Sequence, residues 1–304
     1  MKIQGVFSVL PTPFTSGGLV DAESLCRVVD LFITAGVNGL TALGVTGEVA
    51  RLTEAERVLV LGTVVDHVRG RVPVIAGATA DGTFTCIEFC RQAVSMHASA
   101  VMVSPPRMAK INSEAVVAHY KALAAAIDVP IVVQDYPPIS GYAMEPALLA
   151  RIAREVPHAR TIKLEDPPTP LKTSRILAAS KGLEIDILGG LGGMYLLEEL
   201  ISGASGVMTG FAYPEMLLEV VKLFCSGEVR SAADAFYRYV PLMRFEFQEG
   251  IGMAIRKEIL HRRGALADSG IRQPGVVADP STLTALESLL EWMRDKQGVP
   301  WISA

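Results

Sequence analysis

Residues 5 to 44 read GVFSVLPTPFTSGGLVDAESLCRVVDLFITAGVNGLTALG, and this stretch decides the fold class. Its two ends, 5–10 and 39–44, are short apolar runs with the length of buried strands. Residues 21–36 between them carry apolar side chains at helical spacing, on Leu25, Val28, Val29, Leu31 and Phe32. A strand, a helix and a second strand in this order predict two parallel strands joined by a crossover helix.

The same alternation continues along the chain. The other strand candidates are the apolar runs 72–77, 99–104, 129–134, 159–164, 184–190 and 204–210. Because these runs are almost continuously hydrophobic, both faces of the sheet should be covered, as in a closed barrel inside a ring of helices. We therefore predict an α/β fold, a (β/α)8 TIM barrel. An open doubly wound sheet is the alternative, and we disfavour it because no GxGxxG follows the first strand.

The strand signal stops after about residue 214. Helical patterns follow at 215–227, 231–248, 250–264 and 281–296. The chain is therefore predicted to hold a barrel over residues 1–214, which carries the active site, and a helical C-terminal extension over residues 215–304.

Composition excludes several classes of protein. Half of the 304 residues are hydrophobic, and the net charge of -4 provides no basic surface for nucleic acid. No apolar run approaches the roughly 18 residues that cross a bilayer, so we expect a cytoplasmic protein without a membrane partner. The four cysteines lie in apolar, helix-like runs and are predicted to be reduced core thiols. Without a CxxC motif, and with scattered histidines, a metal site is not expected.

The chemistry of such barrels lies at the C-terminal ends of the strands. The stretch TIKLED, residues 161–166, places Lys163 and Glu165 two positions apart, so both side chains point to the same face of a strand. Burial favours the neutral amine of a lysine, and a neutral amine attacks ketones. A structural salt bridge of Lys163 with Glu165 or Asp166 is the simpler interpretation. Position alone leaves both open.

A family resemblance bears on this choice. GVFSVLPTPFTSGGLVDAESL, followed at matching intervals by GVNGLTALGVTGEVARLTEAER, PVIAGA, VSPP and TIKLED, resembles the dihydrodipicolinate synthase and N-acetylneuraminate lyase family over roughly residues 5 to 215. The resemblance implies a (β/α)8 barrel with a helical extension, a homotetramer built as a dimer of dimers, and no metal or organic cofactor. It also implies a covalent imine between Lys163 and the C2 ketone of pyruvate or a pyruvate-like 2-keto acid.

Substrate-binding residues follow from the same resemblance. The family loop of Gly, Thr or Ser, Thr, Gly, Glu is here Gly44 to Glu48, with Val45 in place of one hydroxyl. Thr46 and the backbone amides beside Gly47 are predicted to hold a carboxylate. Glu48 is expected to be a scaffold residue in the first turn of the next helix.

Further candidates for substrate binding lie elsewhere on the chain. We include Ser8 of the first strand, and Gly189 and Gly190, where paired glycines either let the backbone approach a polyhydroxylated ligand or form only a tight turn. Arg107 takes the position of a tyrosine that the family contributes near the subunit interface.

The chain also departs from the synthase pattern. The relay tyrosine at the end of the fifth strand falls on Gln134, and an arginine that binds the second substrate falls on Ile139. Glutamine cannot exchange a proton at neutral pH. Tyr136 could substitute for the relay if the register shifts by two. We count Gln134 and Tyr136, with Lys163 and Glu165, as candidate catalytic residues.

Gln-Asp after the fifth strand with Lys-x-Glu on the sixth is similar to the branch that contains 2-keto-3-deoxy-L-arabonate dehydratase. That similarity implies a hydro-lyase in which Lys163 forms the imine, Glu165 takes the C3 proton and the C4 hydroxyl leaves as water. Three alternatives stay open. The barrel could be a pyruvate-dependent aldolase or dihydrodipicolinate synthase, or it could bind a keto acid without turnover. Glu165 could also be a solvated partner of Arg160 or Lys172.

Overall fold

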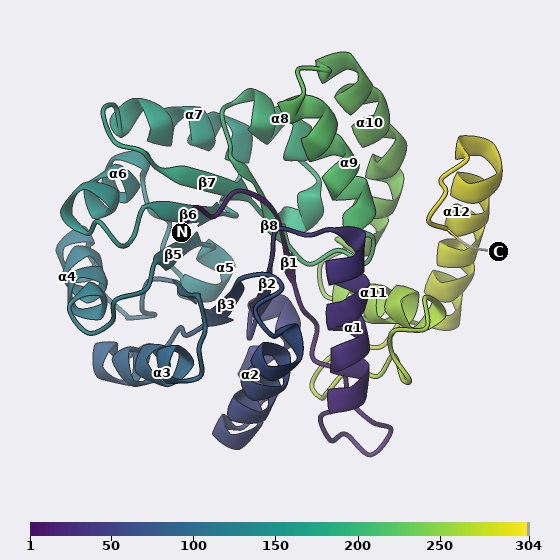
Figure 1. The fold of residues 1–304 in the computed structure, drawn as a ribbon, viewed down its shortest axis with the longest axis horizontal. Helices are drawn as coiled ribbons and strands as arrows, with labels where there is room; N and C mark the ends of the chain where they lie inside the picture. The colour runs from purple at the N-terminus through teal and green to yellow at the C-terminus, as the bar shows by residue number, and fades with distance from the viewer. Residues whose placement is uncertain (303–304) are drawn as a thin grey trace.

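The computed structural model describes residues 1–302 and contains a closed barrel of parallel strands in the order β1 to β8 (Figure 1). Each strand pairs with the next, and β1 pairs with β8 to close the barrel. The strands are β1 (Gly5–Val9), β2 (Gly39–Ala42), β3 (Val74–Gly77), β4 (Ala100–Val103), β5 (Ile131–Asp135), β6 (Thr161–Leu164), β7 (Asp186–Gly189) and β8 (Gly206–Thr209). Seven of the eight predicted runs contain a strand, and the run 129–134 covers β5 except for its last residue, so the TIM barrel is confirmed and the open sheet is wrong.

A ring of helices surrounds the strands in Figure 1. Its members are α1 (Ala22–Ala35), α2 (Glu54–Val68), α3 (Thr83–Ser95), α4 (Ser113–Ala124), α6 (Pro146–Glu155), α7 (Thr169–Ala179), α8 (Leu196–Ile201) and α9 (Pro214–Cys225). Short helices η1 (Val45–Gly47), η2 (Val49–Arg51), α5 (Pro137–Ser140) and η3 (Leu191–Gly193) follow the C-terminal ends of β2, β5 and β7.

The predicted helix at 21–36 illustrates how local signals set the element boundaries. Asp21 accepts a hydrogen bond from the Ser24 amide at 3.0 Å and so caps the N-terminus of α1. Gly36 ends the helix in the left-handed conformation, with φ 99°, where a side chain would be strained. The sequence therefore contains both the helical periodicity and the capping residues that set the two ends of this helix.

The strands separate two hydrophobic layers. Inside the barrel, a compact cluster of buried side chains fills the lumen: Ile3, Phe7, Val9, Ile75, Ala100, Met102, Val132, Leu188 and Met208. A much larger cluster lies between the outer faces of the strands and the helices, and it includes Val6 and Leu10 of the first strand segment. Because the lumen is filled, ligands can reach the barrel only at its ends.

The C-terminal extension consists of α10 (Val229–Glu246), α11 (Gly252–Arg262) and α12 (Pro280–Gln297), and α12 lies at the edge of the molecule (Figure 1). All four helical patterns after residue 214 are helices. Helix α9 packs against β1, α1 and α8 of the barrel ring and also against α10 of the extension. Arg272 joins the extension to α2 through an ion pair with Glu56 at 2.7 Å.

Two smaller expectations concern helices and thiols. Within residues 1–302, none of the helices has the length and apolar character needed to cross a membrane. All four cysteines are free. Cys86 and Cys90 are buried as predicted, whereas Cys26 is half-buried and Cys225 is exposed, so the description as core thiols is wrong for Cys225.

Candidate active site

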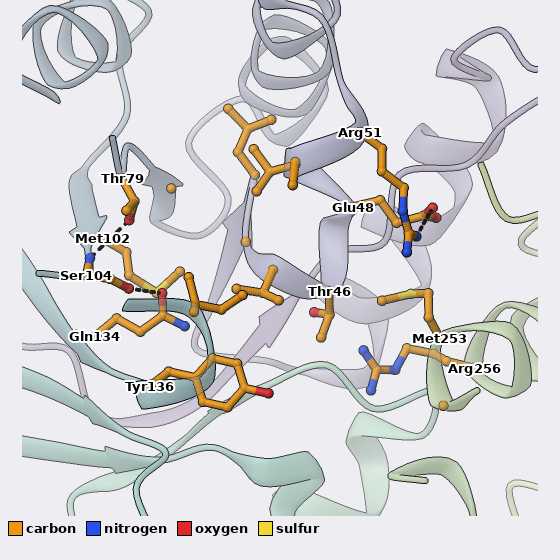
Figure 2. Close-up of a pocket in the computed structure, with 18 of the residues that line it drawn as sticks. Thr46, Glu48, Arg51, Thr79, Met102, Ser104, Gln134, Tyr136, Met253 and Arg256 are labelled. Carbon is orange, nitrogen blue, oxygen red and sulfur yellow. Dashed lines mark hydrogen bonds and ion pairs between the residues drawn. The ribbon is translucent and has the colours of Figure 1, made fainter. Parts of the chain in front are cut away.

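A cavity of about 550 Å³ opens at the C-terminal ends of β2 to β5 (Figure 2). The barrel side of its lining includes Val45, Thr46, Thr79, Ser104, Gln134 and Tyr136. The other side comes from the segment around the α10–α11 connection, with Phe247, Gln248, Glu249, Met253 and Arg256. The helical extension is therefore part of the cavity wall, whereas the sequence predicted an active site carried by the barrel alone.

Lys163 lies on the lumen side of β6, between Gln134 of β5 and Leu188 of β7 in strand register. It is 3% exposed, and its Nζ lies 3.0 Å from Oε2 of Glu165. Glu165 follows the strand end and is 9% exposed. The structure thus brings together the two residues that strand alternation placed on one face. Neither lines the cavity directly, but Gln134 beside them does.

A chain of hydrogen bonds connects this ion pair to the cavity wall. Gln134 Nε2 donates to Glu165 Oε2 at 2.8 Å, and Ser104 Oγ donates to Gln134 Oε1 at 3.1 Å. The Ser104 amide donates to Thr79 Oγ1 at 3.0 Å, and Figure 2 marks the hydrogen bonds of Ser104 with Gln134 and with Thr79. Gln134 therefore spans from a cavity hydroxyl to the carboxylate and holds Glu165 in one orientation. The sequence indicated that Gln134 replaces the relay tyrosine, but it did not indicate that Gln134 contacts Glu165.

Glu165 is not a solvated surface glutamate. Lys172, one of its two alternative partners, lies 2.6 Å from Asp135 Oδ2 and 2.6 Å from Asp166 Oδ2. The other, Arg160, donates to the Ala153 carbonyl at 3.3 Å. Both cations are thus engaged elsewhere.

The paired glycines after β7 make room for two glutamates. A Cβ on Gly190 would lie 2.3 Å from Cγ of Glu165, and a Cβ on Gly189 would lie 1.7 Å from Oε2 of Glu199. Real Cβ atoms do not approach other atoms so closely, so each glycine is needed by its neighbouring carboxylate. Gly190 thus sets the position of Glu165, and the approach of a ligand to these glycines stays a prediction.

Tyr136 and Ile139 both line the cavity at the end of β5. Figure 2 shows the Tyr136 hydroxyl extending into the space between Gln134 and Arg256. Burial, with the nearby charges of Glu165 and Glu249, raises the pKa of Tyr136, so the phenol keeps its proton at neutral pH. Among residues 1–302 it makes no hydrogen bond to Lys163, so the structure shows no direct relay from Tyr136 to the lysine.

The glycine loop after β2 differs from the prediction in its amides. Gly47 and Glu48 donate their backbone amides to the carbonyls of Gly44 and Val45, at 2.9 and 3.0 Å, so these amides are committed to the turn. The buried Thr46 Oγ1, by contrast, has no hydrogen-bond partner within the described part of the chain. Of the two predicted carboxylate donors, the hydroxyl is available and the amides of Gly47 and Glu48 are not.

Glu48 stands between η1 and η2 with φ 57°, well before α2 begins at Glu54, so its expected place in the first turn of the helix is wrong. It is buried and forms ion pairs with Lys257 at 2.5 Å and Arg51 at 2.8 Å. It also accepts from the Arg272 amide at 3.2 Å. These contacts tie the β2 loop to the extension, as expected of a scaffold residue.

Two predicted substrate ligands lie away from the cavity. Ser8 alternates with Phe7 and Val9, which point into the lumen, so it faces the helices on the side of Val6. Arg107 is exposed on the β4–α4 loop and is not part of the cavity wall. Neither side chain contributes to the cavity wall of this chain, and a role of Arg107 at a subunit interface stays a prediction.

The residue that the sequence did not indicate is Arg256 on α11. It is 4% exposed, lines the cavity, and lies in a helix that follows none of the barrel strands. The rule that chemistry follows strand ends could not find it. Within residues 1–302, no cluster of three or more His, Cys, Asp or Glu side chains is arranged to hold a metal ion.

Comparison with known proteins agrees with this fold. The family model described as "Dihydrodipicolinate synthetase family" matches residues 2–293. An L-2-keto-3-deoxyarabonate dehydratase of Azospirillum brasilense is 30% identical over 286 residues, covering 93% of this chain and 92% of the relative. A 4-hydroxy-tetrahydrodipicolinate synthase of Nitratidesulfovibrio vulgaris is 31% identical, with 95% and 98% covered.

Among solved structures, a dihydrodipicolinate synthase from Rhodopseudomonas palustris superimposes with a TM-score of 0.89 at 32% identity, covering 95% of this chain and 97% of the other. The family match extends over nearly the whole chain, including the extension that contributes to the cavity. The chain therefore belongs to the dihydrodipicolinate synthetase family of Schiff-base lyases, which act on pyruvate-like keto acids.

Proposed function

We propose that this enzyme dehydrates a 2-keto-3-deoxy sugar acid through an imine on Lys163. The observation that carries the proposal is the buried pair of Lys163 and Glu165, 3.0 Å apart, with Gln134 holding the carboxylate at 2.8 Å. A nucleophile and a base within hydrogen-bond reach of each other are what imine formation followed by proton abstraction requires. The 30% identity to a dehydratase of this substrate class supports the same assignment.

Glu165 can serve as the base of the elimination. Imine formation comes first: the Lys163 nitrogen adds to the C2 ketone. The nitrogen gives up two protons, relayed by water to the C2 oxygen, and that oxygen leaves as water while the protonated imine forms. The imine acidifies the C3 position, so Glu165 removes a C3 proton and the electron pair gives an enamine.

The enamine then expels the C4 hydroxyl. That hydroxyl takes the proton held on Glu165 and leaves as a second water, and the electrons form a double bond between C3 and C4. Hydrolysis of the imine consumes one water and frees Lys163. The net change is the loss of one water, with no oxidant, reductant or organic cofactor.

Gln134 favours dehydration over the synthase reaction. An amide cannot relay a proton at neutral pH, but it can orient the carboxylate that does. The hydroxyls of Thr79, Ser104 and Tyr136 around the cavity provide hydrogen-bonding groups for a polyhydroxylated substrate. Ile139 provides no charge for the carboxylate of a second substrate.

A panel of 2-keto-3-deoxy acids, with pyruvate plus aldehydes in parallel, tests the proposal by mass spectrometry. Dehydration releases one water and leaves the carbon chain intact. Carbon–carbon cleavage or synthesis as the main reaction would instead establish the aldolase alternative. Imine trapping on Lys163 without turnover of any acid in the panel would favour the non-catalytic alternative.

A further inference from the structure

We propose that Arg256 and Thr46 together bind the C1 carboxylate of the keto acid, so that an arginine from the helical extension selects acids over neutral ketones. This inference rests on the proposed function, because the carboxylate belongs to the same keto acid that is proposed to form the imine. It makes Arg256, on α11, a substrate-binding residue, while the proposed nucleophile Lys163 lies on β6.

Gly210, one residue after β8, shows how close the two side chains lie. A Cβ on Gly210 would be 2.1 Å from Nη1 of Arg256 and 2.9 Å from Oγ1 of Thr46. Both atoms therefore border the same small volume, and one carboxylate can accept from both at ordinary hydrogen-bond lengths. Figure 2 shows Thr46, on the loop after β2, beside the guanidinium of Arg256, which extends from α11.

Both donors lack a partner in the part of the chain that the structure describes. Arg256 uses its Nε to contact Glu246 Oε1 at 2.5 Å, while Nη1 is buried and makes no hydrogen bond. Glu246 Oε2 in turn accepts from the Ala212 amide at 3.1 Å, which fixes the carboxylate and the guanidinium plane. A buried charged donor without an acceptor is unfavourable, so the arrangement indicates a ligand that supplies one.

The chemistry of the two donors selects a carboxylate. The guanidinium presents a planar edge that matches carboxylate oxygens, and the edge carrying Nη1 is left open after Nε binds Glu246. Val45 cannot supply the second hydroxyl of the family loop, and the amides of Gly47 and Glu48 are used in the turn. Arg256 adds a charged donor beside the Thr46 hydroxyl.

The other arginines of the cavity wall have partners. Arg51 donates to Glu48 at 2.8 Å, and Arg57 donates to the Gly77 carbonyl at 3.3 Å and stacks over the Phe89 ring. Within residues 1–302, Arg256 is thus the cavity arginine that has a buried nitrogen without an acceptor.

The test compares borohydride trapping of two small ketones on the intact protein. Pyruvate carries the carboxylate, and hydroxyacetone has the ketone without it. Arg256→Gln should raise the pyruvate concentration for half-maximal trapping by about 10- to 100-fold, the range expected for losing a charged hydrogen bond, and leave hydroxyacetone trapping unchanged. Arg263→Gln is the matched control, since Arg263 forms a similarly buried pair with Glu215 at 2.5 Å but lies outside the cavity.

Further variants separate binding from folding. Arg256→Gln leaves Glu246 without its cation, so the double variant Glu246→Gln/Arg256→Gln, which removes both charges, should show the same selective loss. Arg256→Lys should recover part of the affinity. Equal weakening of both ketones, or parental half-saturation for pyruvate in the single and double variants, would overturn the proposal.

Calorimetric titration of pyruvate in a Lys163→Ala background measures carboxylate binding without the imine. Arg256→Gln should weaken that binding even if the parent forms no imine, so failure of the proposed function is distinguishable from failure of the carboxylate site. Equal pyruvate affinity with and without Arg256 in this background would contradict the site.

Discussion

Glu165→Gln should separate imine formation from proton transfer. Glutamine has nearly the shape of glutamate but is no base, so the variant should still form the imine with pyruvate. Exchange of the C3 protons of pyruvate with deuterated water should slow by about 10²- to 10⁴-fold, the usual contribution of a general base. In activation free energy this is about 3–5 kcal/mol, at roughly 1.36 kcal/mol for each tenfold change.

The contacts of Glu165 set the expected cost in stability. Its Oε2 accepts from Lys163 at 3.0 Å and from Gln134 at 2.8 Å. The amide oxygen of a glutamine can replace one of these acceptors, so we expect unfolding to become easier by about 1–3 kcal/mol, without loss of the fold. This loss is small enough for the variant to be assayed at room temperature.

The assay combines proton NMR of the pyruvate methyl group in deuterated water with borohydride trapping read by intact-protein mass spectrometry. Trapping shows that ligand still reaches Lys163. Glu199→Gln is the control, because Glu199 is also buried but contacts Thr169 at 2.5 Å and lies behind β7, outside the cavity. Parental exchange in Glu165→Gln with normal trapping would refute the reasoning, and Tyr136 or a water held by Gln134 and Thr46 would be the next base to test.

Four other predictions concern Lys163, Gly190, Glu199 and the oligomeric state. Lys163→Ala should abolish the borohydride adduct with pyruvate, and an equal adduct on this variant would exclude Lys163 as the nucleophile. Gly190→Ala should displace Glu165, because the new Cβ would lie 2.3 Å from its Cγ; we expect retained trapping with exchange slowed by up to about 100-fold, and unchanged exchange would show that the glutamate tolerates the shift. Burial raises the pKa of Glu199 from 4.5 to about 7, so the folded chain holds a proton that the unfolded chain releases, and its contribution to stability is lost as pH rises from 4.5 to about 7. Between pH 5 and pH 8, the free energy of unfolding measured by urea denaturation should fall by up to about 3 kcal/mol more in the parent than in Glu199→Gln. An equal fall in both proteins would contradict the assignment. Sedimentation should find the homotetramer that the family resemblance implies, and a monomer at micromolar concentration would correct it.

The sequence by itself determined the barrel and the pairing of Lys163 with Glu165. Both depend on local periodicity: the alternation of apolar runs with helical patterns specifies the units, and the two-residue period of a strand places i and i+2 on one face. The caps at Asp21 and Gly36 are likewise local, because a helix end is satisfied by residues within one turn of it.

Only the tertiary structure decided which side of a strand faces the lumen. The first strand is buried on both sides, so its hydrophobicity carries no alternation, and nothing in the sequence showed that Ser8 points outward while Phe7 and Val9 point inward. The contact between Gln134 and Glu165 joins two strands whose register is set by barrel closure. Local patterns do not contain that register.

Arg256 is the clearest case of a residue that only tertiary structure could place. It lies more than 90 residues beyond Lys163 in sequence, on a helix outside the strand–helix repeat. Its proximity to Thr46 arises because the α10–α11 connection folds back over the barrel mouth, secured by Glu48 with Lys257 at 2.5 Å. Spacing along the chain predicts contacts within an element, whereas a contact between distant elements depends on how their buried faces pack together.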